Sequence, residues 1–211
     1  VSEIQSAGIA GSVSGIVIDE EGKTTVDRLY AAGACTVPSF GLSGALAIGY
    51  SVGIEAAKAS LRIPKVGEHS EREVEKEFES VYAALNRKEG CSYQRFENKL
   101  RQIMGEYVGD IKTEKGLEIG LQKLGELERR ADDVKADNYH ELMRVTEFKD
   151  LLLIGRLIAI AALERKESRM GLSHMRGDYP NQDDAHFHGS MILKKDGDRT
   201  NVTFRPAPIS P

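Results

Sequence analysis

The stretch AAGACTVPSFGLSGALAIGYSVG, residues 31–53, places small residues, a proline, a glycine-containing loop and a long apolar segment one after another. Residues 29–32 predict the end of a short buried strand that Gly33 terminates, and the loop through Gly41 leads to a helix expected from about Ser43. A strand, a glycine-containing loop and a helix N-terminus in this order are typical of a ligand-binding site.

The N-terminus of this predicted helix is the candidate binding surface. Its first backbone N–H groups have no partner within the helix, and with the helix dipole they attract a phosphate or an electron-rich ring oxygen. Gly41 and Gly44 would let a flat ligand approach the backbone, and Gly49 and Gly53 would allow close packing of the helix on a sheet. A helix start and a packing face without a ligand would explain the same residues, so both explanations stay open.

Charge and motif content argue against several functional classes. The chain has 211 residues with 29 basic and 33 acidic side chains, and its net charge of -4 does not suit nucleic acid or an anionic membrane as a partner. The sequence contains no GxxxxGK[ST] motif. Gly8, Gly11 and Gly15 do not follow a predicted strand, as a dinucleotide-binding fingerprint requires.

The cysteines and the longest apolar stretch indicate the cellular setting. Cys35 and Cys91 lie far apart and form no metal-ligand or CxxC spacing, which favours reduced thiols and a cytoplasmic location. The apolar residues 151–163 include Arg156 and are too few to cross a bilayer core of about 30 Å. We therefore expect no transmembrane segment.

Composition divides the chain into three segments. Residues 1–63 hold much of the glycine and little charge, and within them residues 15–19 and 24–26 predict a β-hairpin around a turn-rich tetrapeptide. Residues 64–170 are rich in charged side chains with apolar residues at helical spacing, and residues 171–211 again change in character.

Helical periodicity in the second segment predicts a bundle. Ser70 and Glu73 have the spacing of a capping box at the start of the first helix. The expected helices are, in chain order, 70–88, 93–109, 113–137 and 138–168. They indicate three or four antiparallel helices, which need no ligand to be explained.

The third segment contains a second hairpin signal and several histidines. Residues 191–193 and 202–204 are apolar or β-prone and flank Asp196-Gly197-Asp198. The spacing of His174, His186 and His188 matches no metal site that can be defended, so no metal ion is expected.

Two longer stretches carry a family resemblance. The order GIVIDEEGKTTVDRLYAAGA…GLSGALAIGYSVGIEAA, followed by a helical region that ends in ALERKESRMGLSHMRGDYPNQDD, resembles the C-terminal part of the succinate dehydrogenase and fumarate reductase flavoproteins. That family includes L-aspartate oxidase and the adenylylsulfate reductase α subunit. The resemblance covers nearly the whole chain from Ser14, and residues 167–169 with His174, Arg176 and residues 178–180 are its most specific part.

The resemblance implies an α+β fold in three parts. Residues 1–63 would be a small β/α remnant, the C-terminal segment of an FAD-binding domain. Residues 64–170 would form the antiparallel helical bundle, and residues 171–211 would form a C-terminal tail with a β-hairpin.

The resemblance also implies where FAD would bind. Gly33 and Ala34 would lie near the adenosine side of the cofactor. The helix N-terminus would face the pyrimidine part of the isoalloxazine ring, where it stabilises negative charge around N1 and the C2 oxygen. The residues expected to meet this ring are Phe40, Gly41, Leu42, Ser43, Gly44 and Ala45.

Three departures from the family pattern bear on the substrate. Family members often have an acidic residue at the position of Ala34, whose carboxylate binds the adenosine ribose. Succinate-type members have His-Gly-x-Asn-Arg before the helix, whereas this chain has Pro-Ser-Phe-Gly at residues 38–41. The family histidine near a Met-Gly-Gly turn is absent from residues 6–15. The loop is more similar to that of adenylylsulfate reductase or of an uncharacterised reductase.

The chain also lacks the N-terminal GxGxxG half of the FAD-binding domain and the capping domain that the family uses. It would be a fragment of a longer flavoprotein or a separate subunit completed by another chain, and we favour the fragment. Its expected partners are these missing regions and an iron-sulfur electron-transfer subunit, which would also offer peripheral attachment at the inner membrane.

Two functions are therefore considered. The first is an FAD-dependent oxidoreductase that transfers hydride between flavin and a small substrate when complete, with His174 and Arg176 as candidate catalytic residues and with this chain alone inactive. The second is a non-catalytic helical protein-interaction module. For the tail, an ion-pair network to the bundle is the alternative to catalysis, and its members would be Arg169, Arg176, Asp178, Asp183 and Asp184.

Overall fold

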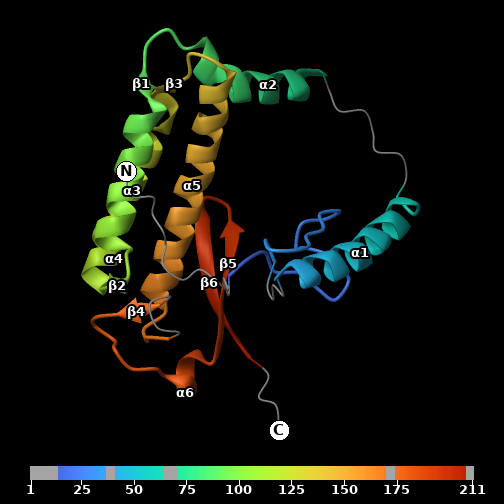
Figure 1. Ribbon diagram of the computed structural model, residues 1–211, viewed down its shortest axis with the longest axis vertical. Helices are drawn as coiled ribbons and strands as arrows, with labels where there is room; N and C mark the ends of the chain where they lie inside the picture. Colours follow the sequence, from blue (N-terminus) through green and yellow to red (C-terminus); the bar gives the residue numbers. More distant parts are fainter. Residues whose placement is uncertain (1–13, 37–40, 64–70, 170–173, 208–211) are drawn as a thin grey trace. The chain divides into compact units, whose positions relative to one another are not determined.

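The computed structural model describes residues 14–36, 41–63, 71–169 and 174–207 (Figure 1). The chain divides into two compact units, Val1–His69 and Ser70–Pro211. Helices dominate the described residues, and three small two-stranded sheets accompany them, so the predicted α+β class is confirmed. The segment boundaries at 63 and 170 stay predictions.

The first unit consists of irregular chain followed by one long helix, α1 (Gly41–Ser60). The turn expected after residue 19 is present, because Asp19 Oδ1 accepts hydrogen bonds from the backbone N–H groups of Glu21 and Lys23. The hairpin predicted around it is wrong. Lys23 instead pairs with Tyr30 in an isolated antiparallel bridge.

Residues 29–32 do not form the buried strand that was predicted. Among the described residues, Tyr30 makes a single bridge, to Lys23, and Leu29 is 50 % exposed. An isolated bridge provides no sheet that could cover the neighbouring side chains. The helix itself was predicted correctly, but it begins at Gly41 rather than near Ser43.

One side of α1 packs within the unit and the other is exposed. The backbone of Gly22 (φ 79°) lies against the side chain of Val52, which is the buried residue of α1. Leu42, Leu46 and Tyr50 are exposed and recur every four residues, so they lie on one helix face.

The second unit is built on three antiparallel helices, α3 (Tyr93–Tyr107), α4 (Glu114–Arg129) and α5 (Tyr139–Glu164), which lie side by side in Figure 1. A fourth helix, α2 (Glu71–Asn86), contacts α5. The bundle of three or four helices is thus confirmed. Ser70, the predicted capping residue of α2, lies outside the described residues.

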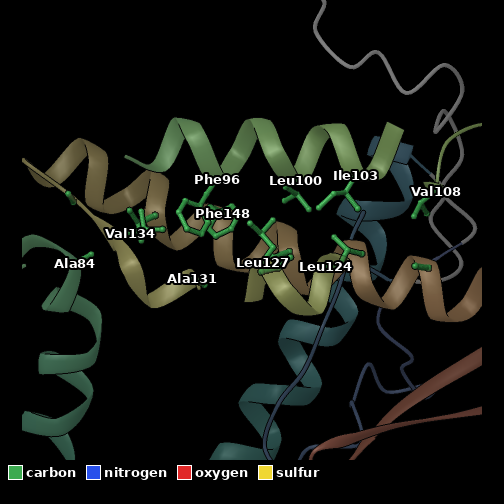
Figure 2. Close-up of a cluster of buried hydrophobic side chains, with 14 of the residues drawn as sticks. Ala84, Phe96, Leu100, Ile103, Val108, Leu124, Leu127, Ala131, Val134 and Phe148 are labelled. Carbon is green, nitrogen blue, oxygen red and sulfur yellow. The ribbon is translucent and has the colours of Figure 1, made fainter. Parts of the chain in front are cut away.

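The core of the second unit lies between these helices. Figure 2 shows Phe96 of α3 against Phe148 of α5, with ring centroids 5.7 Å apart in an edge-to-face arrangement. Leu117 and Leu124 of α4 are fully buried in the same cluster. These side chains recur at helical spacing, which is why the sequence alone could place the helices.

Short parallel strand pairs hold the loops at the two ends of the bundle. At the end near α2, β1 (Cys91–Ser92) pairs with β3 (Val134–Lys135), next to the 3₁₀ turn at Ala131–Asp133. At the other end, β2 (Ile111–Lys112) pairs with β4 (Met175–Arg176), as Figure 1 shows. The second pair connects the tail to the bundle.

The tail continues through a short helix, α6 (Asp184–Phe187), into the hairpin of β5 (Gly189–Asp196) and β6 (Arg199–Pro206). The predicted hairpin is confirmed, with Met191 opposite Phe204. Gly197 occupies the left-handed region (φ 58°) in the two-residue turn. Among all described residues, no helix is long and apolar enough to cross a membrane.

Candidate functional site

The N-terminus of α1 is open, and its first turn has no acidic side chain that would repel a bound anion. Gly41 has φ 65°, and a Cβ at this position would meet none of the described atoms within 4 Å. Gly41, Leu42 and Ser43 are exposed, and the first turn contains no acidic residue. The first backbone N–H groups of a helix lack partners within it, so this end favours negative charge.

The turn at Gly33 lies beside the same end of the helix. Gly33 has φ 87°, and its carbonyl oxygen accepts hydrogen bonds from the backbone N–H and the hydroxyl of Thr36, at 3.0 and 2.8 Å. A Cβ built on Gly33 would lie 3.6 Å from the Cβ of Ala45. The first unit thus brings the Gly33 turn and the start of α1 together, with Ala34 exposed.

These residues fit the electron-rich edge of a flavin. The first turn of α1 offers helix N–H groups, small side chains at Gly44 and Ala45, and open space at Gly41. Ala34 offers no carboxylate to an adenosine ribose, as the sequence indicated. Phe40, the remaining residue predicted to contact the ring, lies outside the described residues.

In the second unit, Arg176 is fully engaged at the C-terminal end of α5. Its Nη1 donates to the carbonyl oxygens of Ala162, Leu163 and Arg165, at 2.6, 3.3 and 3.2 Å. Its Nε and Nη2 bind the two carboxylate oxygens of Asp178, each at 2.8 Å. The hydrogen bonds from Arg176 lower the pKa of Asp178 to about 2. Arg176 is only 1 % exposed, so its guanidinium is directed at the protein's own backbone.

Glu167 is the centre of a second ion-pair group. Its carboxylate is fully buried, binds Arg165 and Arg169, and accepts a hydrogen bond from the backbone N–H of Asp183 at 2.8 Å. Burial alone would raise the pKa of Glu167, but these hydrogen bonds outweigh it, so the pKa lies below its usual value. Arg169 also binds Asp184 at 2.7 Å, which attaches the tail to the segment that follows α5.

The ion pairs predicted for the tail are present, but they form two separate groups, Arg176 with Asp178 and Arg169 with Asp184. Asp183 joins the second group only through its backbone N–H, and its carboxylate pairs with His186. Arg165 and Glu167 were not expected, although Glu167 holds the second group together. The sequence contained a signal, because Glu167 is the single acidic residue in Arg-Lys-Glu-Ser-Arg, directly after the helix.

His174 lies among cations. Its Nε2 is 3.1 Å from the carbonyl oxygen of Arg165, so Nε2 carries a proton and donates. Burial lowers the pKa of His174, and the nearby charges of Lys112, Arg165 and Arg176 lower it further. Lys112 on β2 is itself buried, and burial lowers its pKa. The structure thus brings His174 and Arg176 together around the end of α5.

The remaining histidines do not gather into a metal site. His186 Nδ1 lies 2.8 Å from Asp183 Oδ2 and is exposed. Within the described ranges, no group of three or more His, Cys, Asp or Glu side chains could hold a metal ion.

A flavoprotein family profile covers most of the second unit, including both ion-pair groups. Residues 97–211 match the family profile described as the C-terminal part of the fumarate reductase flavoprotein. The chain therefore belongs to the fumarate reductase flavoprotein family, and the resemblance seen in the sequence is confirmed.

Individual relatives agree with this assignment. The chain is similar to an uncharacterized FAD-dependent oxidoreductase of Methanocaldococcus jannaschii, at 28 % identity over 86 % of this chain and 34 % of that protein. It is 26 % identical to the fumarate reductase flavoprotein subunit of Haemophilus influenzae, over 94 % of this chain and 36 % of that protein. The chain thus spans about a third of the length of the curated relatives it matches.

A solved structure shares the fold. Adenylylsulfate reductase from the hyperthermophilic Archaeoglobus fulgidus superposes with a TM-score of 0.83 over 91 % of this chain and 35 % of that chain. The sequence identity is 23 %, so this likeness concerns the fold alone.

Proposed function

We propose that this chain forms part of an FAD-dependent oxidoreductase of the fumarate reductase type, in which the first unit completes the flavin site and the second supplies the helical domain. The observation that carries the proposal is the open, acid-free N-terminus of α1, in a chain whose residues 97–211 belong to a flavoprotein family.

Each part of the first unit has a distinct role in this proposal. Gly41, Leu42, Ser43, Gly44 and Ala45, together with Phe40, line the pyrimidine side of the flavin, and Gly33 and Ala34 approach the adenosine side. The N–H groups at the start of α1 stabilise negative charge on the ring. FAD supplies the chemistry when bound, because its ring exchanges a hydride with a small substrate.

For His174 and Arg176, a catalytic role stays a prediction. The contacts of Arg176 with the last carbonyl groups of α5 favour a role in holding the tail. His174, which donates to one of the same carbonyl groups, would support it.

The proposed partners are the rest of the FAD-binding domain, a capping domain and an iron-sulfur subunit. A partner for electrons is supported by the Haemophilus influenzae relative, which is named a flavoprotein subunit. The proposed location is the cytoplasm, with attachment at the inner membrane through such a partner. This chain alone would be inactive.

The test is an absorbance spectrum between about 350 and 500 nm, where bound flavin absorbs. The 211-residue chain, with and without added FAD, is compared with the chain co-expressed with a candidate N-terminal half. We expect a flavin band only in the co-expressed sample.

Matched variants locate the cofactor. Ser43→Asp places a carboxylate in the first turn of α1 and should weaken flavin retention by about tenfold or more, whereas Ser60→Asp at the other end of the same helix should not. No band in either sample, with well-folded protein, would overturn the proposal and leave the interaction module as the better account.

A further inference from the structure

An aromatic patch lies on α2 and the first turn of α5. We define the patch as Val74, Phe78, Tyr82 and Tyr139. The rings of Phe78 and Tyr82 stack with centroids 4.2 Å apart, and Tyr82 meets Tyr139 edge-on at 6.4 Å. Val74, Phe78 and Tyr139 are 58, 60 and 72 % exposed. Aromatic side chains in such a cluster are typical of the centres of protein interfaces.

The patch continues an apolar stripe that is buried only at one end. Val74, Phe78, Val81 and Leu85 recur at helical spacing along α2. Leu85 packs against the bundle core, whereas every residue from 71 to 80 is exposed. Figure 1 shows α2 extending away from α3, α4 and α5. Within the described residues of the second unit, the apolar stripe is therefore covered only in the last turns of α2, and its first half is exposed.

The charges of α2 that flank the stripe are acidic. By helical geometry, Glu71 and Glu75 lie along one side of the stripe, and Glu73 and Glu77 lie along the other. The two basic residues of α2, Arg72 and Lys76, fall on the opposite face. A partner that covers the stripe therefore meets an acidic rim.

This rim limits what can bind. Anionic lipid headgroups and nucleic acid would be repelled. A second copy of α2 would bring two acidic rims together, which costs binding energy. An apolar helix face flanked by lysine or arginine matches both the stripe and the charge.

We propose that the aromatic patch binds a basic amphipathic helix of a partner protein. The helix lies along α2, its apolar residues cover Phe78 and Tyr82, and its cations pair with Glu75 and Glu77. A groove of about 440 Å³ adjoins the patch at Val81 and can accept one further apolar side chain between Ala84, Val134 and Val145. Its lining also includes Arg87, Asp132 and Lys149, so the cations of the partner helix meet glutamates along α2 and not at this groove. The interaction does not depend on the flavin site proposed above.

The experiment measures fluorescence anisotropy of two labelled peptides with the full chain. One is a helical peptide of about 18 residues with a leucine stripe flanked by lysines. The other has glutamates in place of the lysines. We expect saturable binding of the lysine peptide only, weakened when salt rises from about 50 to 500 mM because the pairs are exposed.

Variants separate the patch from general effects. Phe78→Ser should weaken binding by at least about tenfold, and Glu75→Lys should also weaken it. The matched controls are Ile111→Ser, exposed at the other end of the bundle, and Glu118→Lys on α4. Both controls should bind like the unchanged chain.

Several results would overturn the proposal. Equal binding of both peptides, loss of binding in the controls, or no saturable binding would each do so. Sedimentation that reveals a dimer lost in Phe78→Ser would show that a second copy covers the patch. Binding to anionic vesicles that Phe78→Ser abolishes would show a lipid surface instead. If Phe78→Ser alone lowered the melting temperature by several degrees, the patch would already be covered without the peptide.

Discussion

The guanidinium of Arg176 donates a hydrogen bond of 2.6 Å to the carbonyl oxygen of Ala162, which precedes it by 14 residues. The last carbonyl groups of a helix have no partner inside it, and glycine-based turns often satisfy them. Here a buried side chain from the tail takes that role, while Asp178 balances its charge. The end of α5 and the tail are therefore stabilised together.

Arg176→Lys should destabilise the second unit by about 3 kcal/mol. Lysine keeps the charge but cannot bind the Asp178 carboxylate through two nitrogens while reaching the carbonyl groups of α5. Urea denaturation monitored by circular dichroism measures the loss. Arg95→Lys, at an exposed position on α3, is the control and should change stability by less than about 0.5 kcal/mol. Equal stability of the two variants would contradict the conclusion that Arg176 caps the C-terminal end of α5.

Glu97→Gln should cost about 2 kcal/mol. Glu97 of α3 is buried and binds both Arg101 and Arg144, the latter across the bundle at 2.9 Å. Burial raises the pKa of Glu97, but the hydrogen bonds from both arginines outweigh it and the pKa is lowered. The same denaturation experiment measures the effect, and the matched change Glu118→Gln on exposed α4 surface should be close to neutral.

Stability should fall on acidification in two steps. The pKa of His174 is lowered from 6.5, so below about pH 6.5 the unfolded chain binds a proton that the folded chain does not, and stability declines until the folded pKa is passed. The pKa of Asp178 is about 2 in the folded chain against an ordinary 3.8. Its contribution to stability is therefore complete above about pH 3.8 and is lost as the pH falls towards 2. Denaturation across pH tests both steps. His174→Gln should remove the first step and keep the second.

Three glycine-to-alanine substitutions should change the stability of the first unit by different amounts. Gly22→Ala combines a positive φ with a Cβ 2.2 Å from Val52 Cγ2 and should cost about 3 kcal/mol. Gly41→Ala has the positive φ but open space, and should cost about 1 kcal/mol. Gly49→Ala lies inside α1 with open space and should stabilise by up to about 1 kcal/mol. Thermolysin cleavage of the first unit, followed by mass spectrometry, gives the order, and any other order would refute the argument.

The helices and the tail hairpin could be predicted because their signals are local. Leu117 and Leu124 repeat at helical spacing, and Gly197 marks the turn between two β-prone runs. In the structure, Thr113 and Asn138 cap α4 and α5 by accepting hydrogen bonds from the backbone N–H groups three residues later, which is also local.

The features that were missed depend on distant contacts. The strand expected at residues 29–32 needs neighbouring strands, which the described residues do not provide. The last helix ends at Glu164 rather than at 168, because the following residues turn to place Glu167 between Arg165 and Arg169. For the candidate site, the sequence suggested Gly33 and Ala45, but their proximity required coordinates.

The cap on α5 also sets an order of folding. Synthesis begins at the N-terminus, so the carbonyl group of Ala162 is made 14 residues before the arginine that binds it. Until then the last turn of α5 remains hydrated and frayed. The loop that must close is short and adds little entropic cost, so the turn can form soon after Arg176 is available. A chain that stopped short of Arg176 would lose this final turn together with the tail.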